Sequence, residues 1–360
     1  MLIFCAAAPS SAKVDVSAQS AIVIDCASNR VLYEKDAYTK RGMASTTKIM
    51  TALIAIENLS SDEIVTVSPF ASGTEGSSIW LSPGEHMSVS DLLYGLMLSS
   101  GNDAATALAE HTAGSVEAFT FMMNEKARAI GAFETHFTNP HGLPDDEHYT
   151  TAYDLALIAS YAMKNPKFAE IVSTERKVIS WEGSEWDRSL KNHNKLLSRS
   201  ENCIGIKTGF TKKDGRCLVT AFEKDKMVLI GVTLSAPDDW NDHIKMTNEI
   251  FDLYSPYTVC EKGKSAGSYL LKGADKDRVS IYYADSYIMP VSENDKDHIT
   301  TKPVFNVTYP INKGQKIGKL EIYFDNDLIG AVDLISKDSA MLEPTFFDVC
   351  KNLMKGIIRQ

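Results

Sequence analysis

The chain has 360 residues, of which 44% are hydrophobic and 23% are charged, a composition that is ordinary for a soluble globular protein. A chain of this length favours two domains over one. Its formal net charge of −10 at pH 7 argues against a nucleic-acid partner, which would require a basic face.

Residues 1–17 differ in composition from the rest of the chain. The apolar start, MLIFCAAA, is followed by the small residues Pro9-Ser10-Ser11-Ala12 and then by Lys13. A short apolar segment with a small-residue zone is typical of the end of a secretory signal peptide, although no Lys or Arg precedes it here. We therefore expect residues 1–17 to be a remnant of such a signal, or else a tail.

The six cysteines do not form a metal-binding pattern. None lies in a C-x-x-C pair, and no His and Cys spacing matches a zinc site. We expect them to behave as small buried hydrophobic residues, and the sequence alone assigns no disulfide.

Hydrophobic patterning predicts an α+β domain over residues 18–257. Segments 21–24 and 31–33 flank a turn and predict a β-hairpin. Helices are predicted next, at 45–58, in two runs within 90–113 that break at residues 99–101, and at 116–130 and 151–163. Strands at 204–207, 218–222 and 227–234 and a helix at 239–254 come after them. The hairpin and the later strands together predict a five-stranded antiparallel sheet with helices.

The sequence pattern changes after Ser255-Pro256, where short apolar segments typical of strands alternate with Gly, Asp, Asn and Lys. They predict a small all-β domain over residues 258–343. Its expected strands are 279–283, 288–291, 304–308, 319–323 and 331–334.

Residues 344–360 place their apolar side chains on one helical face, with Lys351, Lys355 and Arg359 mostly off it. This pattern predicts an amphipathic helix that lies on a membrane surface, with a helix packed on the β domain as the alternative. No stretch of the chain is long enough to span a bilayer.

Three short motifs carry the chemistry, and the first is Ser45-Thr46-Thr47-Lys48. Residues three apart at a helix start lie on one face, so Lys48 can serve Ser45 as a base. A lysine does so if burial or another cation lowers its pKa. The motif alone would also fit a helix cap with a surface lysine, but the apolar residues after it predict a buried helix.

The other two motifs are Ser100-Gly101-Asn102, in a break between helical runs, and Lys207-Thr208-Gly209, at the end of an edge-like strand. The first can direct a hydroxyl and an amide into a cleft, although a helix-capping turn would look the same. In the second, a glycine leaves room for a ligand to lie along the strand, and Lys207 and Thr208 can hold a carboxylate.

Together and in this order, the three motifs form an S-x-x-K, S-x-N and K-T-G set. The chain resembles the low-molecular-weight penicillin-binding proteins, specifically the serine D-Ala-D-Ala carboxypeptidases of peptidase family S11. The resemblance covers about residues 18 to 255 well. Beyond the three motifs, it includes the segments 139–143, 148–156, 192–197 and 215–219.

The resemblance implies that Ser45 attacks the peptide bond between two D-alanines of a peptidoglycan pentapeptide while Lys48 takes its proton. It also implies an oxyanion hole from the backbone N–H groups of Ser45 and Phe210, and a proton relay through Ser100 and Lys207. Asn102 would hold the substrate amide, and no metal or organic cofactor would be needed. β-Lactam antibiotics would acylate Ser45, and the protein would work outside the cytoplasm, on the outer face of the cytoplasmic membrane.

One departure concerns an Arg that many such carboxypeptidases carry after the last catalytic strand. Residues 237–243 contain no Arg, and Arg216 is a possible substitute for binding the substrate carboxylate or else an ordinary surface residue.

Three alternatives stay open: a class A-like β-lactamase, a D,D-transpeptidase and a non-catalytic wall-binding protein. A class A-like enzyme needs a deacylating Glu, for which Glu147 is the best candidate in an unfavourable context. A transpeptidase would use the same residues with an amine acceptor, and intact Ser45, Lys48 and Lys207 argue against a non-catalytic protein.

Overall fold

A computed structural model describes residues 14–343, and their contacts divide the chain into two units, one ending at Ser255 and the other starting at Pro256. The expected amphipathic helix at 344–360 and residues 1–13 of the expected signal remnant lie outside the described residues.

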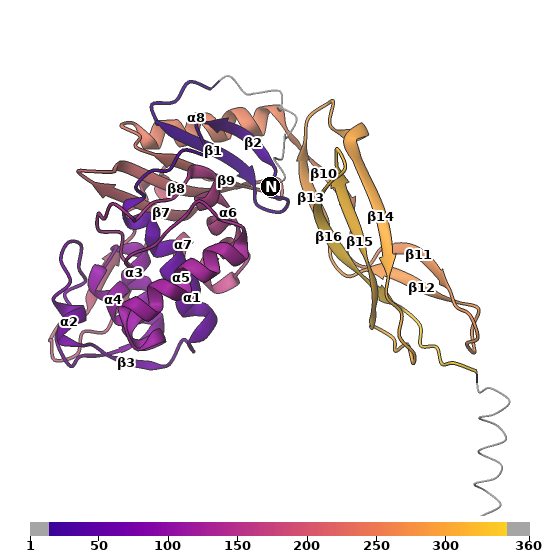
Figure 1. The fold of residues 1–360 in the computed structure, drawn as a ribbon, viewed down its shortest axis with the longest axis horizontal. Helices are drawn as coiled ribbons and strands as arrows, with labels where there is room; N and C mark the ends of the chain where they lie inside the picture. Colours follow the sequence, from indigo (N-terminus) through magenta and orange to yellow (C-terminus); the bar gives the residue numbers. More distant parts are fainter. Residues whose placement is uncertain (1–13, 344–360) are drawn as a thin grey trace, which may run out of the picture. The chain divides into compact units, whose positions relative to one another are not determined.

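The first unit is built on a five-stranded antiparallel sheet with the strand order β2-β1-β9-β8-β7 (Figure 1). Its strands are β1 (Ser20–Asp25), β2 (Val31–Lys35), β7 (Cys203–Thr211), β8 (Gly215–Lys224) and β9 (Met227–Leu234). The predicted hairpin and sheet are confirmed, and β7 lies at the edge. The prediction of a strand ending at Lys207 is wrong, because β7 continues to Thr211 and pairs with β8 throughout.

Helices cover both faces of this sheet, with α8 on one side and the other helices on the opposite side (Figure 1). They are α1 (Lys48–Asn58), α2 (Pro69–Ser72), α3 (Val89–Leu98), α4 (Asn102–Ala113), α5 (Val116–Ile130), α6 (Ala152–Met163), α7 (Pro166–Ser173) and α8 (Asp239–Leu253). Short 3₁₀ helices lie at η1 (Ala44–Thr47) and η2 (Lys195–Ser198).

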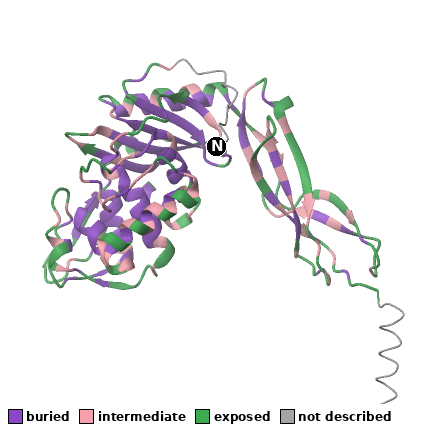
Figure 2. Cartoon of the chain, in the orientation of Figure 1, coloured by how far each residue is buried: buried purple, intermediate pink, exposed green. Residues whose placement is uncertain are grey.

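The alternation of side chains along each strand explains the two layers. Ile22 and Ile24 of β1 belong to the core under the helical group, whereas Val23 between them packs with Met246 and Ile250 of α8. Both faces of the sheet are therefore apolar and buried, as Figure 2 shows by the purple strands.

Local capping signals set the helix boundaries. Ser115 accepts a hydrogen bond from Ala118 N at the start of α5, and Gly131 ends it with φ +97°. The predicted helix at 45–58 differs at its start, because residues 44–47 form the tighter turn η1 and α1 begins only at Lys48.

Several short elements were not predicted, because each is brief and is stabilised by tertiary contacts rather than by its own periodicity. They are α2, α7, β3 (Ile64–Thr66), β4 (His86–Ser88), β5 (Arg176–Ile179) and β6 (Arg188–Lys191). β3 pairs with β4, and β5 pairs with β6.

Residues 14–17, which we expected to belong to a leader or tail, pack on the first unit instead. Val16 is buried, and Ser17 donates from its backbone N and its Oγ to the buried carboxylate of Asp242, at 2.9 and 2.7 Å. These contacts fix the entry of the chain into β1.

The second unit contains a five-stranded sheet with the order β11-β12-β16-β15-β14 and a separate pair, β10 with β13. The strands are β10 (Ser255–Cys260), β11 (Ser265–Leu270), β12 (Arg278–Tyr283), β13 (Tyr287–Val291), β14 (Ile299–Phe305), β15 (Lys316–Phe324) and β16 (Asp327–Ser336), with the 3₁₀ helix η3 (Lys296–His298). The all-β prediction is confirmed, but β10 and β11 were missed and the strand expected at 304–308 ends at Phe305.

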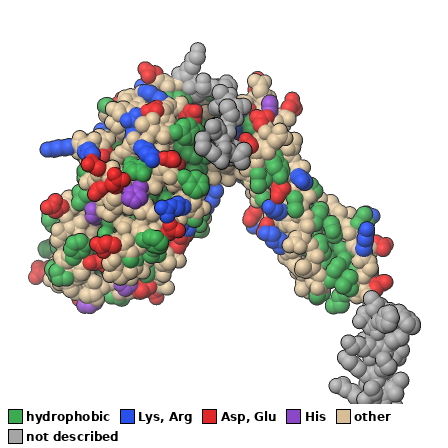
Figure 3. All heavy atoms as spheres, in the orientation of Figure 1, with side chains coloured by type: hydrophobic (Ala, Val, Ile, Leu, Met, Phe, Trp, Pro, Cys, Tyr) green, Lys and Arg blue, Asp and Glu red, His purple; other side chains and the backbone are tan. Residues whose placement is uncertain are grey.

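Hydrophobic side chains gather on the face of the second unit shown in Figure 3. Among residues 256–343, the large hydrophobic residues that are exposed are Leu270, Leu328, Met341 and Leu342. Over residues 14–343, no helix has the length and apolar character needed to cross a bilayer. Cys26, Cys203, Cys217 and Cys260 are buried free thiols.

Candidate active site

Ser45 and Lys48 meet at the junction of η1 and α1. The Nζ of Lys48 lies 3.0 Å from the Oγ of Ser45, 2.7 Å from the Oδ1 of Asn102 and 2.6 Å from the carbonyl oxygen of His141. The side chain of Lys48 has no exposure at all, whereas Ser45 is half-buried and so reachable. A hydroxyl open to a ligand therefore contacts a buried amine, which is the arrangement of a nucleophile and its base.

Residues of the loop at 138–148 pack against the tight turn that carries Ser45 and hold its backbone in place. Ala44 has φ +47°, and a Cβ on Gly142 would lie 1.9 Å from its carbonyl oxygen, so only glycine fits there. Thr138 N donates to Nδ1 of His148, which leaves Nε2 to donate to Thr47 Oγ1 at 2.8 Å. Burial lowers the pKa of His148 to about 4, so this ring is neutral and structural.

The predicted break between helical runs brings Asn102, the last residue of the Ser100-Gly101-Asn102 motif, to Lys48. Ser100 lies between α3 and α4 with φ +62°, an unusual conformation for a residue with a side chain, and it is buried. Asn102 starts α4, and its Nδ2 donates to the carbonyl oxygen of Glu75 at 2.5 Å while Oδ1 accepts from Lys48. The two bonds fix the orientation of the amide.

The loop behind Asn102 is held by Asp103, a buried acid in the first turn of α4. Its carboxylate accepts hydrogen bonds from the backbone N of Ile79 and Leu81 and from Ser78 Oγ. A negative charge at a helix N-terminus is also stabilised by the helix dipole. The loop at 75–81 is thereby bound to the helix that carries Asn102.

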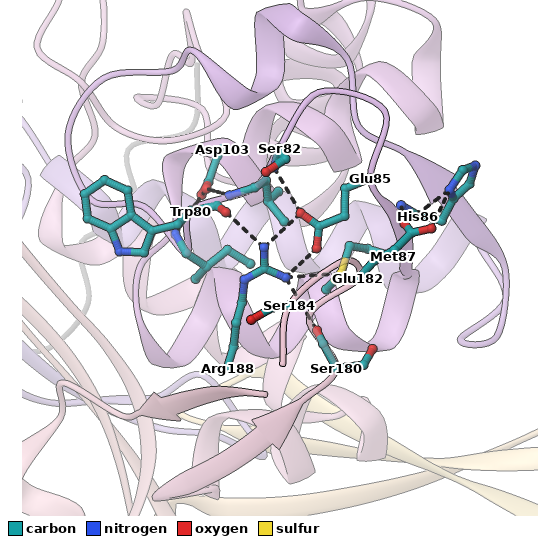
Figure 4. Close-up of polar contacts among 12 residues, drawn as sticks. Trp80, Ser82, Glu85, His86, Met87, Asp103, Ser180, Glu182, Ser184 and Arg188 are labelled. Carbon is teal, nitrogen blue, oxygen red and sulfur yellow. Dashed lines mark hydrogen bonds and ion pairs between the residues drawn. The ribbon is translucent and has the colours of Figure 1, made fainter. Parts of the chain in front are cut away.

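A buried ion pair joins the residue before β4 to the β5–β6 hairpin (Figure 4). The guanidinium of Arg188 pairs with both carboxylate oxygens of Glu85, and Nη2 also donates to the carbonyl oxygen of Trp80 at 2.9 Å. The side chains of Arg188 and Glu85 are only 5% and 2% exposed. The ring of Trp181 lies 4.5 Å from the guanidinium, so the cation is enclosed.

The Lys207-Thr208-Gly209 motif lies inside β7, directly beside η1. A Cβ on Gly209 would lie 3.0 Å from the backbone N of Ser45 and 3.1 Å from Met43 O. Its missing side chain lets the edge strand approach the turn that carries Ser45. The expectation that this glycine also leaves room for a ligand along the strand stays a prediction.

Two buried lysines dominate the electrostatics of the site. Burial lowers the pKa of Lys207 to about 7, and its Nζ donates to the carbonyl oxygen of Thr208 at 3.0 Å. Burial and then the charge of Lys207 lower the pKa of Lys48 well below its usual range. Lys48 can thus be neutral, as a base must be, and Lys207 is cationic below about pH 7.

Two predicted binding residues lie further along β7 and β8. Phe210 is exposed and pairs in register with Arg216. The guanidinium of Arg216 is bound to the carboxylate of Asp239 at 3.0 and 2.8 Å and lies over Trp240. The structure therefore places Arg216 at the start of β8, opposite Phe210 of β7, and pairs it with Asp239 of α8.

Glu147, the alternative deacylating residue, is exposed, and its described contacts do not reach Ser45 or Lys48. His141 lies against Lys48, and mainly its burial lowers the pKa of its ring to about 3. Its Nδ1 accepts a hydrogen bond from Leu143 N, so it is a structural residue of the loop.

Sequence reasoning missed Asp103, Glu85 and Arg188. An acid directly after Asn102 at a helix start was a usable signal for Asp103. Glu85 and Arg188 are 103 positions apart, and no local pattern links them.

Residues 6–238 match the Peptidase S11 family, D-alanyl-D-alanine carboxypeptidase, and residues 254–340 match the penicillin-binding protein 5, C-terminal domain. The chain is 30% identical over 348 residues to D-alanyl-D-alanine carboxypeptidase DacF of Bacillus subtilis, covering 94% of this chain and 89% of that one. It is 36% identical over 260 residues to a D-alanyl-D-alanine carboxypeptidase of Streptomyces sp. strain K15, covering 67% of this chain and 89% of that one.

Solved structures agree with these relatives. Penicillin binding protein 5 from Haemophilus influenzae superposes with a TM-score of 0.70 at 26% identity, covering 91% of this chain and 98% of that one. A mutant of the Streptomyces K15 DD-transpeptidase superposes with a TM-score of 0.63 at 35% identity, covering 67% and 100%. The chain belongs to the Peptidase S11 family of D-alanyl-D-alanine carboxypeptidases.

Proposed function

We propose that this protein is a serine-type carboxypeptidase that removes the terminal D-alanine from peptidoglycan stem pentapeptides. The observation that carries the proposal is the contact of the buried Nζ of Lys48 with Ser45 Oγ and Asn102 Oδ1, beside the second buried lysine, Lys207. Family membership supplies the substrate class, because the relatives in Bacillus subtilis and Streptomyces are D-alanyl-D-alanine carboxypeptidases.

In the acylation step, neutral Lys48 takes the proton of Ser45 as Oγ attacks the carbonyl carbon between the two D-alanines. The backbone N–H groups of Ser45 and Phe210 stabilise the oxyanion. The C–N bond then breaks, and Ser100, backed by Lys207, delivers a proton to the leaving D-alanine. The products are an ester on Ser45 and free D-alanine.

Substrate binding uses the edge of β7 and the amide of Asn102. An extended peptide pairs with an exposed strand edge through its backbone. Lys207 and Thr208 hold the terminal carboxylate. Arg216 of β8, whose side chain is 39% exposed beside its partner Asp239, is the further candidate for binding this carboxylate. Water then hydrolyses the ester and restores Ser45.

The test uses benzylpenicillin and a peptide in parallel. Intact-protein mass should show one covalent adduct that peptide mapping places on Ser45, and diacetyl-Lys-D-Ala-D-Ala should release D-alanine. Rapid loss of the adduct without D-alanine release would mean a β-lactamase. No adduct and no D-alanine would mean a protein that only binds the wall.

The similarity to a DD-transpeptidase structure supports transpeptidation as a second candidate function. A transpeptidase forms the same ester on Ser45 but passes it to an amine instead of to water. Adding glycine as an acceptor to the peptide assay separates the two. We expect the hydrolysed product to dominate, and a product that is mostly glycyl peptide would overturn the preference for water.

The pKa of Lys207, lowered to about 7 by burial, predicts a pH dependence of substrate binding. The ammonium is present below pH 7 and is lost above it, so its attraction for the substrate carboxylate weakens as pH rises. The ratio of kcat/KM for a peptide acid to that for its methyl ester should therefore fall above pH 7. The titration of Lys48 affects the acid and the ester equally, so it cancels in this ratio.

Lys207→Arg is the matched variant, because a guanidinium stays charged over the whole range. Its acid-to-ester ratio should be flat from pH 6 to 9. A flat ratio in the native protein would show that Lys207 does not hold the carboxylate.

We further propose that residues 344–360 attach the protein to the outer face of the cytoplasmic membrane. The support is their amphipathic sequence with Lys351, Lys355 and Arg359 off the apolar face. Deleting 344–360 should abolish co-sedimentation with anionic vesicles and leave D-alanine release intact. Unchanged sedimentation would refute the anchor, and replacing the three cations by Gln should weaken binding in proportion to the anionic lipid.

A further inference from the structure

A basic cavity of about 370 Å³ lies between the β5–β6 hairpin and η2, and none of the proposed catalytic residues lines it. Its lining includes four cationic side chains, those of Arg176, Lys191, Lys195 and Arg199, and one carboxylate, that of Glu175. The formal charge of these five side chains is +3, although the chain as a whole carries −10. The volume falls in the range of roughly 300–1,000 Å³ that small-ligand sites occupy.

The protein itself does not neutralise the four cations of the basic cavity. Among residues 14–343, their side chains make no hydrogen bond and no ion pair. The chain has 47 acidic residues against 37 Lys and Arg, so a shortage of carboxylates is not the reason. Arg176 and Lys191 are direct partners in the register of β5 and β6, an arrangement of like charges that destabilises a sheet. The cavity therefore concentrates positive charge that an external anion would neutralise.

Buried amides hold the segment 192–199, which carries two of the four cations. Asn192 donates from Nδ2 to two backbone carbonyl oxygens at the C-terminal end of α7, at 3.2 and 3.0 Å, and its Oδ1 accepts from Asn194 N at 2.9 Å. Asn194 Oδ1 accepts in turn from the N of Leu196, whose side chain is fully buried. The backbone beneath Lys195 and Arg199 is thus fixed before a ligand arrives, which lowers the entropic cost of binding.

We infer that the basic cavity is a binding site for a phosphate-bearing anion with two or more negative charges, such as a diphosphate. A guanidinium binds phosphate oxygens through two parallel N–H groups, and a lysine ammonium adds a point charge. A single carboxylate, such as a peptide carries at its end, would leave most of the positive charge in the cavity unpaired. The inference is independent of the reaction proposed at Ser45.

The test titrates the full-length protein with inorganic pyrophosphate by isothermal titration calorimetry at pH 7 and low salt. The native protein should bind, and added salt should weaken the binding because exposed charges are screened. Arg176→Gln combined with Arg199→Gln should weaken it by about tenfold, since two charge-assisted contacts are lost. A native protein that binds no pyrophosphate would overturn the site.

The matched control is Lys245→Gln combined with Lys302→Gln, which removes the same charge from exposed positions of α8 and β14 outside the basic cavity. This control should bind pyrophosphate as the native protein does. Equal weakening in both double variants would show that pyrophosphate follows only the overall charge of the protein, and the site would be wrong.

Thermal unfolding separates loss of the site from loss of the fold. Pyrophosphate should raise the Tm of the native protein and of the control, because a ligand that binds only the folded state stabilises it. Lys191→Gln is a second variant that removes one of two facing like charges, so without ligand its Tm should be native or higher. It should still bind pyrophosphate more weakly, and native affinity in this variant would contradict the inference.

Two further probes define the ligand. Citrate carries a comparable charge on carboxylates and should bind at least about tenfold more weakly than pyrophosphate; equal binding would overturn the assignment to phosphate. Co-sedimentation with phosphatidylglycerol vesicles identifies the source of the phosphate. Weaker sedimentation of the Arg176 and Arg199 double variant than of the control would assign the cavity to a lipid headgroup, and equal sedimentation with weaker pyrophosphate binding would assign it to a soluble phosphate.

Discussion

Replacing Ser45 by Ala should abolish the penicillin adduct and lower D-alanine release by roughly 10⁴- to 10⁶-fold, the loss seen when a serine hydrolase loses its nucleophile. The reason is geometric, because Ser45 Oγ is the hydroxyl that lies within 3.0 Å of the amine of Lys48. The measurement is kcat for diacetyl-Lys-D-Ala-D-Ala together with intact-protein mass after benzylpenicillin.

A matched control is Thr46→Ala, one position along the same turn. The hydroxyl of Thr46 is buried and donates to Met43 O, so it is turned away from the amine. This variant should keep its penicillin adduct even if the turn becomes less stable. An adduct on Ser45→Ala, or one that is lost only with Thr46→Ala, would show that Ser45 is not the nucleophile.

Replacing Arg188 by Met should destabilise the first unit by about 3–5 kcal/mol, because it leaves the charge of Glu85 buried and unpaired. For a unit of this size the loss corresponds to a fall in Tm of about 10 °C. The measurement is thermal unfolding followed by circular dichroism or calorimetry.

The double variant Arg188→Met with Glu85→Leu provides the control for this prediction. An apolar pair of similar volume avoids the unpaired charge, so the double variant should recover most of the lost Tm. A double variant that is as unstable as Arg188→Met would mean that the bonds of Arg188 to Trp80 O and Ser180 O carry the stability instead. A single variant with native Tm would show that the pair contributes nothing.

The elements that the sequence predicted best are those with local signals. The helix predicted at 116–130 forms over the same residues, since its apolar spacing, the Ser115 cap and Gly131 are all encoded within the segment. The strand predicted at 227–234 is equally local. By contrast, β5 and β6 depend on Arg188 and on contacts more than a hundred positions away, and no window of sequence contains that information.

The candidate site also contains some features that local sequence predicts and others that only tertiary packing shows. Ser45 and Lys48 were found from sequence because residues three apart on one turn are neighbours whatever the rest of the chain does. The sequence could suggest that Lys207 lies nearby, but only the packing of β7 against η1 shows why Gly209 must lack a side chain. The contact between Lys48 and Asn102 joins residues 54 positions apart and could only be inferred through the family resemblance.

By itself, the sequence determined the candidate nucleophile, its neighbouring amine, the family and the two-part organisation, because these depend on motifs and periodicities within short segments. The tertiary structure decided the environment of those groups: the burial that lowers the pKa of Lys48 and Lys207, and the ion pair of Glu85 and Arg188. It also assembled the basic cavity between the β5–β6 hairpin and η2. Burial, electrostatic coupling and empty volume are properties of segments brought together in space, so they exist only once the chain has folded.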